Sequence, residues 1–353
     1  MKYSIIVPVY NRPDEVDELL QSLTEQELKD FEVVIVEDGS QKPCKDVCDK
    51  FADILDLHYY VKENGGPGQA RNYGAERAQG EWLIILDSDV VLPKGYLKAV
   101  EDGLRGERRE EGGEFAAFGG PDASHPSFTP VQKAISYSMT SFFTTGGIRG
   151  GKKKLDKFYP RSFNMGIRRD VYQQLGGFSK MRFGEDIDFS YRIVEAGYNP
   201  QLIPDAWVWH KRRTDFRKFF RQVYNSGIAR INLEKRHPGT LKLVHLLPMV
   251  FTVGVIALIL IAAVARAMIH YDAPNWHTWY WICLLALSPI LFYSLIIFID
   301  SSIKNKSMKV GLLSVPAAFV QLMGYGFGFI ESWWKRCVMK KDEFQAFEKN
   351  FYK

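Results

Sequence analysis

Four short apolar runs in the first hundred residues are each followed by a helical pattern, and this alternation restricts the fold of the chain more than any other feature. "YSIIVPV" precedes "DEVDELLQSL", "FEVVIV" precedes "CKDVCDKFA", "LHYYV" precedes "GQARNYGAERA", and "EWLIIL" precedes "KGYLKAVEDGL". Strands that are apolar on both faces and joined through helices form a mainly parallel sheet that is covered on both sides. The sequence therefore predicts a Rossmann-like α/β domain.

Polar residues and glycines stand directly after each predicted strand. In sheets of this kind ligands bind at the carboxyl ends of the strands, and glycine lets the backbone approach a ligand closely. We therefore expect one binding site, to which the chain contributes Pro8, Tyr10 and Asn11 after the first strand, Glu37 and Asp38 after the second, Gly68 and Arg71 after the third, and Asp87, Ser88 and Asp89 after the fourth.

Two carboxylates, Asp87 and Asp89, flank Ser88 at the end of the fourth apolar run. In an extended chain both carboxylates point to one side and the serine points to the other. Adjacent carboxylates repel each other unless a cation lies between them, and oxygen ligands favour Mg²⁺ or Mn²⁺. An isolated pair of this kind is usually a solvated turn, but the position after a buried strand, beside three other polar loops, favours a metal site.

A carboxylate pair with a metal suits a ligand that carries a diphosphate. The sequence has no G-x-x-x-x-G-K-[ST] phosphate loop, and "GGPGQARNYG" lacks the G-x-G-x-x-G spacing of dinucleotide-binding proteins. These patterns leave a nucleotide-sugar as the expected ligand, with Asp38 as an acceptor for the base. Arg71 is either a phosphate partner or a surface arginine of its helix, and its spacing supports both equally.

Two further candidates lie later in the chain. Glu185 and Asp186 open a predicted helix that ends at Ala196, and the helix dipole alone is the favoured explanation for acids at that position. His210 ends "DAWVWH"; a single histidine is usually a core or surface residue, but one near the carboxylate pair would be a natural third metal ligand. The segment 101–159 predicts loops, including "SHPSFTP", that could form a lid or an acceptor surface.

Long apolar runs begin after Pro238 and indicate a membrane part. Leu246 to Met268 and Trp279 to Ile299 are each long enough to span a bilayer, whereas the run 310–330 is interrupted by Pro316 and by three glycines. Basic residues concentrate at 211–242, directly before the first run, where they would lie against anionic lipid headgroups. The adjacent membrane segment accounts for these charges, so we expect no nucleic-acid partner.

The distribution of charge also predicts an orientation. Basic loops stay in the cytoplasm, which makes the first two apolar segments a hairpin. The basic residues that follow Trp334 also favour the cytoplasm, so the third segment is re-entrant or interfacial, or the charge rule fails there. No signal peptide precedes the first strand, and we expect a cytoplasmic catalytic domain at the inner membrane. The expected parts are a catalytic domain over 1–238, a membrane region over 239–334 and a basic or amphipathic tail over 335–353.

Six motifs occur in the order and with the spacing of one known family: "SIIVPVYNR", "VEDGS", "GGPGQARNYG", "LDSD", "FNMGIRRDVYQQLGGF" and "GEDIDFSYRI". Over about residues 3–230 the sequence resembles the family 2 glycosyltransferases of the GT-A fold. The resemblance implies an inverting mechanism in which Asp38 binds the nucleobase, Asp87 and Asp89 hold the metal and the diphosphate, Asp186 deprotonates the acceptor, and His210 completes the metal site.

Two departures from the family pattern refine this expectation. Glu37 stands where aspartate is usual, and "RQVYNSGIAR" replaces the Q-x-x-R-W of the processive cellulose- and chitin-type synthases. The resemblance thus implies a non-processive transferase with Mg²⁺ or Mn²⁺, a UDP-, GDP- or dTDP-sugar donor and, given the membrane segments, a lipid-linked saccharide acceptor. One alternative is a polyprenyl-phosphate glycosyltransferase that makes a lipid-phosphosugar, and another is a catalytically silent sensor of nucleotide-sugars.

Overall fold

The computed structural model describes residues 1–106, 114–125, 127–146, 158–271 and 274–347. The chain divides into two compact units, which are Met1–Pro126 with Lys152–Lys211, and Ser127–Gly151 with Arg212–Lys353. This division differs from the expected boundary at residue 238, because the segment after Lys211 packs with the helices of the second unit. Each unit is described by itself.

A seven-stranded sheet forms the centre of the first unit, with the strand order β3-β2-β1-β4-β8-β6-β9. The first four of these are parallel, β8 is antiparallel to both β4 and β6, and β9 is parallel to β6. The mainly parallel sheet predicted from the sequence is thus confirmed. Its strands are β1 (Tyr3–Val9), β2 (Phe31–Asp38), β3 (Leu57–Lys62), β4 (Trp82–Leu86), β6 (Ala117–Gly119), β8 (Asn164–Arg168) and β9 (Gln201–Leu202).

Helices cover both faces of this sheet. Alternate side chains of β1 point to opposite faces, so that Ile5 packs with Leu19 of α1 and Val100 of α4, while Ile6 packs with Ala70 of α3 and Phe189 of α8. Burial on both faces explains why the central strands are apolar along their whole length. The helices of the first unit are α1 (Pro13–Thr24), α2 (Lys45–Asp49), α3 (Pro67–Ala75), α4 (Tyr96–Gly106), α7 (Arg169–Gln174) and α8 (Glu185–Glu195).

A second, three-stranded sheet lies at the end of β4. Its order is β5-β10-β7, and its strands are β5 (Val90–Val91), β10 (Val208–His210) and β7 (Asp122–Ala123). In the antiparallel pair of β10 with β5, His210 lies opposite Val90. The small sheet therefore brings a residue from late in the chain next to the end of β4.

Regular structure replaces part of the loop predicted over 101–159. The described residues of "SHPSFTP" before Pro130 belong to no helix or strand, as predicted, but α5 (Pro130–Thr140) and α6 (Phe142–Thr145) of the second unit were not predicted. Thr129 and Gln132 form a capping box at the start of α5, with Pro130 in the first turn. Most of "RGERREEGGE" and "TTGGIRGGKKK", which were also predicted as loops, lies outside the described residues.

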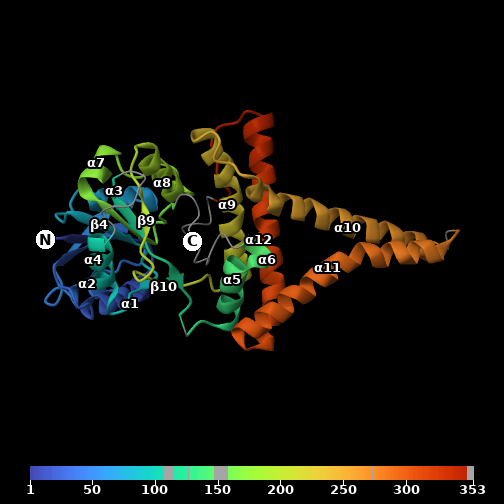
Figure 1. Ribbon diagram of the computed structural model, residues 1–353, viewed down its shortest axis with the longest axis horizontal. Coiled ribbons are helices and arrows are strands. Elements are labelled where there is room, and N and C mark those ends of the chain that lie inside the picture. Colours follow the sequence, from blue (N-terminus) through green and yellow to red (C-terminus); the bar gives the residue numbers. More distant parts are fainter. Residues whose placement is uncertain (107–113, 126, 147–157, 272–273, 348–353) are drawn as a thin grey trace. The chain divides into compact units, whose positions relative to one another are not determined.

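Long helices make up the rest of the second unit, and Figure 1 shows α9 beside α12 and the pair α10 and α11 as a hairpin. Among the described residues three helical stretches are long and apolar enough to cross a membrane, with mean hydropathy 2.7, 2.6 and 1.5 in chain order. The first two confirm the prediction, and the third is the segment that the sequence left open. Pro289 and Pro316 lie inside helices without ending them. The elements are α9 (Phe216–Arg236), a 3₁₀ turn (Leu243–Leu246), α10 (Leu247–His270), α11 (Trp276–Asn305), α12 (Met308–Trp333) and a π-helical turn (Trp334–Val338).

Candidate active site

The two aspartates after β4 meet His210 of β10. Oxygens of Asp87 and Asp89 and a ring nitrogen of His210 all lie within 4.8 Å of one another. His210 Nε2 is 3.2 Å from Asp89 Oδ1 and 4.0 Å from Asp87 Oδ2. The structure therefore brings the three sequence-predicted metal ligands to one point, although 121 residues separate Asp89 from His210 along the chain.

One oxygen of each of these two carboxylates pairs with an arginine. Arg12 Nη1 lies 2.5 Å from Asp89 Oδ2, and Arg71 Nη2 lies 2.8 Å from Asp87 Oδ1. In each aspartate one oxygen thus contacts an arginine, while the other faces His210. Charge-assisted bonds of this kind fix the orientation of a carboxylate. Arg12 was not among the predicted site residues, although it follows the end of β1 just as Asp87 follows the end of β4.

The surroundings of His210 suit a metal ligand. Its ring stacks on Phe163 at a centroid distance of 5.0 Å, and its Nδ1 is buried without a hydrogen-bond partner in the described part of the chain. Two carboxylates and an imidazole match the ligands that Mn²⁺ accepts, and the carboxylates also suit Mg²⁺. The donor set at this point fits a divalent cation.

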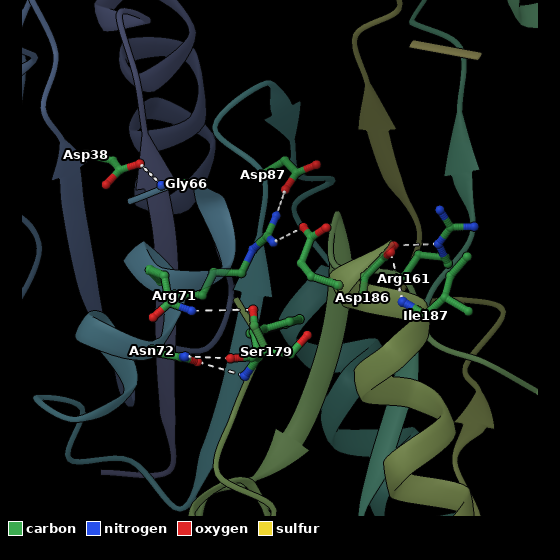
Figure 2. Close-up of polar contacts among 12 residues, drawn as sticks. Asp38, Gly66, Arg71, Asn72, Asp87, Arg161, Ser179, Asp186 and Ile187 are labelled. Atoms are coloured by element: carbon green, nitrogen blue, oxygen red, sulfur yellow. Dashed lines mark hydrogen bonds and ion pairs between the residues drawn. The ribbon is translucent and has the colours of Figure 1, made fainter. Parts of the chain in front are cut away.

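Arg71 links this cluster to the start of α8. Its side chain is 3% exposed, and Nη1 lies 2.8 Å from Glu185 Oε1 while Nη2 contacts Asp87, as Figure 2 shows. Of the two interpretations offered by the sequence, the surface arginine is therefore wrong. Burial raises the pKa of Glu185, and the neighbouring Asp186 raises it further, so that it reaches about 7 despite the opposing charge of Arg71.

Asp186 is held differently from its neighbour. Arg161 Nε lies 2.6 Å from Asp186 Oδ2, and the backbone N–H of Ile187 donates to Oδ1 at 2.9 Å (Figure 2). Burial acts to raise the pKa of Asp186, but the charges of Arg161 and Arg71 outweigh it, and the pKa falls below its ordinary value of 3.8. At neutral pH Asp186 is a carboxylate. Arg161 stands in "YPRSFN", which carries no recognisable pattern, and sequence reasoning missed it.

Asn72 ties α3 to the segment that leads into α8. Its Nδ2 donates to the carbonyl of Phe178 at 2.8 Å, and its Oδ1 accepts from the N–H of Phe178 at 2.8 Å. Gly184, with φ +83°, then turns the chain into the helix, a backbone angle that glycine adopts without steric cost. The two acids therefore emerge at a fixed place beside Arg71.

The acids after β2 make contacts within their own loops. Asp38 accepts from the backbone N–H groups of Gly65 and Gly66 at 2.9 and 2.8 Å, and from Lys62 Nζ at 2.8 Å. Glu37 Oε2 accepts from the N–H of Cys44 at 2.8 Å and from Tyr59 Oη at 3.2 Å, and Ser40 donates to Oε1. Both carboxylates therefore order the backbone at this edge of the sheet.

The other predicted residues lie at the same edge. Asn11 Oδ1 accepts from the N–H groups of Gln41 and Lys42, so it joins the loop after β1 to the loop after β2. Pro8 lies in β1 and Tyr10 follows it, Ser88 is buried between the two aspartates, and Gly68 lies in α3. A Cβ at position 68 would lie 3.2 Å from Phe178 Cβ, which is a tight contact.

Residues 4–176 match the model of the family "Glycosyl transferase family 2". Among curated relatives, the poly(ribitol-phosphate) β-N-acetylglucosaminyltransferase TarS of Staphylococcus aureus is 39% identical over 102 residues, which cover 28% of this chain and 18% of TarS. The glycosyltransferase AglE of Haloferax volcanii is 26% identical over 240 residues, 65% of this chain and 73% of AglE. The match to TarS thus spans less than a fifth of that protein.

One solved structure with a similar fold is the mannosyltransferase PcManGT from Pyrobaculum calidifontis, in complex with GDP-Man and Mn²⁺. The likeness has a TM-score of 0.55 at 16% identity, and covers 95% of this chain and 88% of that one. At this identity it shows the fold, which is of the GT-A type. Over residues 4–176 the chain therefore contains a glycosyltransferase family 2 domain.

Proposed function

We propose that the chain is an inverting, non-processive glycosyltransferase that moves a sugar from a nucleotide-diphosphate donor to a hydroxyl of a lipid-linked glycan. The observation that carries the proposal is a chain of ion pairs that runs from Glu185, the neighbour of Asp186, to the cluster of two aspartates and His210. The carboxylate of Asp186 stands next to Glu185, which is joined through Arg71 to Asp87 of the Asp87–Asp89–His210 cluster. A base and a cluster suited to a diphosphate-bound cation are therefore held in fixed relation.

The donor would be held at the edge of the sheet. Asp87, Asp89 and His210 would bind Mg²⁺ or Mn²⁺, which when bound neutralises the charge of the departing nucleotide diphosphate. The complex of PcManGT with GDP-Man and Mn²⁺ supports this choice of ligands. Among the described residues Asp38 Oδ2 accepts only from Gly66, and a carboxylate oxygen can accept a second bond, so it retains a position for an N–H of the base.

Asp186 would act as the general base. Its lowered pKa keeps it ionised at neutral pH, and a carboxylic acid can accept a proton only in its ionised form. The acceptor hydroxyl gives its proton to Asp186 while its oxygen forms a bond to the anomeric carbon. The bond from that carbon to the diphosphate oxygen breaks on the opposite face, so one displacement inverts the configuration.

The acceptor would be presented at the cytoplasmic face of the inner membrane. Three helical stretches have the length and apolar composition to span a bilayer, and basic residues at 211–242 precede the first of them. Such residues are attracted to anionic headgroups. A lipid-linked saccharide is the acceptor that this arrangement favours, since the lipid would keep it at the surface where the chain is anchored.

A donor screen tests the proposed activity. Purified protein is incubated with UDP-, GDP- and dTDP-sugars, with and without Mn²⁺, and release of the nucleotide diphosphate is measured together with transfer to extracted lipid-linked acceptors. We expect metal-dependent turnover of one donor class. Asp186→Asn should lower transfer by about 10²–10⁴-fold, the usual contribution of a general base, with little change in nucleotide affinity.

The outcomes separate the alternatives. Equal loss of nucleotide binding and of transfer in Asp186→Asn would contradict the role of Asp186 as base. Transfer to a polyprenyl phosphate that survives the substitution would favour the lipid-phosphosugar synthase, because a phosphate oxygen needs little base catalysis. Donor binding without turnover, under every condition, would favour the silent sensor.

A further inference from the structure

Helices α9 and α12 of the second unit pack backbone to backbone. A side chain at Gly328 of α12 would overlap the carbonyl oxygen of Tyr224 in α9, and one at Gly227 of α9 would overlap the carbonyl oxygen of Tyr325 in α12. Ser332 Oγ donates to the carbonyl of Ile228 at 3.2 Å. Figure 1 shows the two helices side by side. Two of the glycines that interrupt the third apolar segment, Gly324 and Gly328, are therefore contact points with α9.

The composition of α9 prevents it from lying in hydrocarbon. Arg217, Lys218 and Arg221 lie in its first two turns, and Arg230, Glu234, Lys235 and Arg236 lie in its last two. The uncharged stretch between Arg221 and Arg230 is too short to span a bilayer. Charged side chains are among the most unfavourable groups in a bilayer core. A helix whose backbone touches α9 over several turns must lie at the same depth as α9. In α12 itself Glu331 binds Tyr224 Oη and Lys335 Nζ at 2.5 Å each.

The hairpin of α10 and α11 contacts α12 through its two open ends. A side chain at Gly311 would lie 2.8 Å from the carbonyl oxygen of Phe298, near the end of α11, and one at Gly326 would lie 2.6 Å from that of Pro248, at the start of α10. Gly311 and Gly326 are about 22 Å apart along α12, at about 1.5 Å per residue. Gly326 is 18 residues, or about 27 Å, into α12, so in a third span antiparallel to α11 it would lie beside the second half of α10, not beside its first turn.

The buried share of the three apolar helices also distinguishes α12 from α10 and α11. In the most apolar 18 residues of each stretch, 17% of the residues are buried for α10, 11% for α11 and 44% for α12. The hairpin exposes large apolar side chains such as Leu260 and Leu291, as helices surrounded by lipid do. The half of α12 after Gly324 packs on α9, and it ends in Trp333 and Trp334, both about half exposed, which is typical of a membrane interface.

We propose that α10 and α11 alone cross the bilayer, while α9 and α12 lie together along its surface against anionic headgroups. The proposal rests on the membrane part of the proposed function and adds the depth of each helix. The bilayer surface matches this pair of helices in charge, because Arg217, Lys218, Lys335 and Arg336 flank the apolar side chains. If α12 does not cross the bilayer, its basic end stays on the same side as residues 211–242. The basic residues after Trp334 then agree with the rule that basic loops stay in the cytoplasm.

Cysteine labelling with a membrane-impermeant maleimide tests the arrangement. Cys44 and Cys48 are buried, so the background protein carries Cys283→Ser and Cys337→Ser. The three reporter variants in this background are Ala52→Cys, Met308→Cys and Thr278→Cys, all at exposed positions, and a fourth protein keeps the native Cys337. Labelling in detergent serves as the control that each cysteine is reactive.

We expect Thr278→Cys to react in intact cells, and Ala52→Cys, Met308→Cys and Cys337 to react only after permeabilisation. Reaction of Cys337 together with Thr278→Cys in intact cells would make α12 a third span and overturn the proposal. Reaction of all four positions only after permeabilisation would show that the hairpin does not cross, which overturns the membrane part of the proposed function as well. The reverse pattern at all four positions would support the depth of α12 and contradict only the cytoplasmic orientation.

A spin label at Cys337 tests the depth directly in vesicles that contain anionic lipid. Its relaxation should respond more strongly to nickel chelated at the headgroups than to oxygen, which concentrates in the bilayer core. The opposite order would place the end of α12 in hydrocarbon and overturn the proposal. A label at Thr252→Cys would not serve as a control because Thr252 is buried in the second unit, whereas Leu260→Cys, on the exposed side of α10, should respond mainly to oxygen.

Discussion

Arg161 keeps Asp186 charged, and its removal should change the pH dependence of transfer. Without Arg161, the effect of burial on the pKa of Asp186 is opposed by fewer charges, so the pKa rises. A base is lost as the pH falls through its pKa, so the acid limb of log kcat should move to higher pH in Arg161→Gln. The profile of kcat between pH 4 and 8 measures this shift.

Arg168→Gln is the matched control for this measurement. Arg168 forms ion pairs with Glu114 and Asp170. In the described part of the chain these two acids contact no residue of the Asp87–Asp89–His210 cluster. Its acid limb should coincide with that of the unchanged protein. An unshifted profile in Arg161→Gln, with a uniform fall in kcat, would mean that Arg161 only positions the acid.

Asp89 offers a test of the metal cluster that does not depend on turnover. Replacing it with alanine removes one oxygen that faces His210 and another that holds Arg12. We expect Asp89→Ala to weaken Mn²⁺-dependent nucleotide binding by at least about tenfold, since even outer-shell changes have effects of that size. Titration calorimetry with and without Mn²⁺ measures it.

Asp49→Ala is the control, because Asp49 is exposed and pairs only with Lys45 among the described residues. It should bind the nucleotide as the unchanged protein does. An Asp89→Ala protein that kept the full effect of Mn²⁺ would remove Asp89 from the metal site.

Individual site residues differ in how far the sequence could predict them. Asp87 and Asp89 could be predicted because they follow the end of a buried strand within a recognisable motif. The ion pair of Arg71 with Glu185 joins positions 114 residues apart, so no local pattern contains it. Arg161 stands outside every motif, and only the folded position of α8 gives it a partner. Sequence reasoning therefore named Asp87, Asp89, Arg71 and Asp186 and missed Arg161, which holds Asp186.

At the scale of elements, the contact of α9 with α12 depends on glycine. A methyl group at Gly328 would overlap the carbonyl oxygen of Tyr224, so the two backbones would have to separate. We expect Gly328→Ala to destabilise the protein by roughly 1–3 kcal/mol, as overpacked cores do, although alanine is the better helix former. The shift in Tm of the purified protein in detergent measures the loss.

Gly254→Ala in α10 is the matched control. A side chain at that position meets no atom within 4 Å, so only helix propensity changes, and alanine favours a helix over glycine by about 1 kcal/mol. Its Tm should be unchanged or slightly higher. Equal Tm values for the two variants would show that the α9–α12 contact tolerates a side chain, and would weaken the inferred coupling of their depths.

The elements themselves were predictable to different degrees. Strands β1, β2 and β4 are buried on both faces and were found, together with the half-buried β3. Helix α5 was missed although Thr129, Pro130 and Gln132 carry the start signal of a helix, because the surrounding Ser, His and Pro residues indicate a loop. Strands β6 and β10 are three residues long and depend on pairing with distant strands.

At the scale of the whole molecule, membrane anchoring predicts how the acceptor is recognised. A lipid-linked acceptor and an anchored enzyme share one surface, which raises their effective concentration without any new contact at the site. With a fixed donor, transfer to a lipid-linked saccharide in vesicles should therefore show a lower KM than transfer to the same saccharide without lipid. The kcat values should be similar, because the same hydroxyl reaches the same Asp186.

The two acceptors are compared at equal bulk concentration in the same vesicles, so that donor, metal and protein are identical. A detergent solution, in which the shared surface is lost, provides the control, and there the two KM values should approach each other. A lower KM that persisted in detergent would mean that a pocket of the chain binds the lipid itself. Equal KM values in vesicles would mean that the three apolar helices only anchor the chain and do not affect the choice of acceptor.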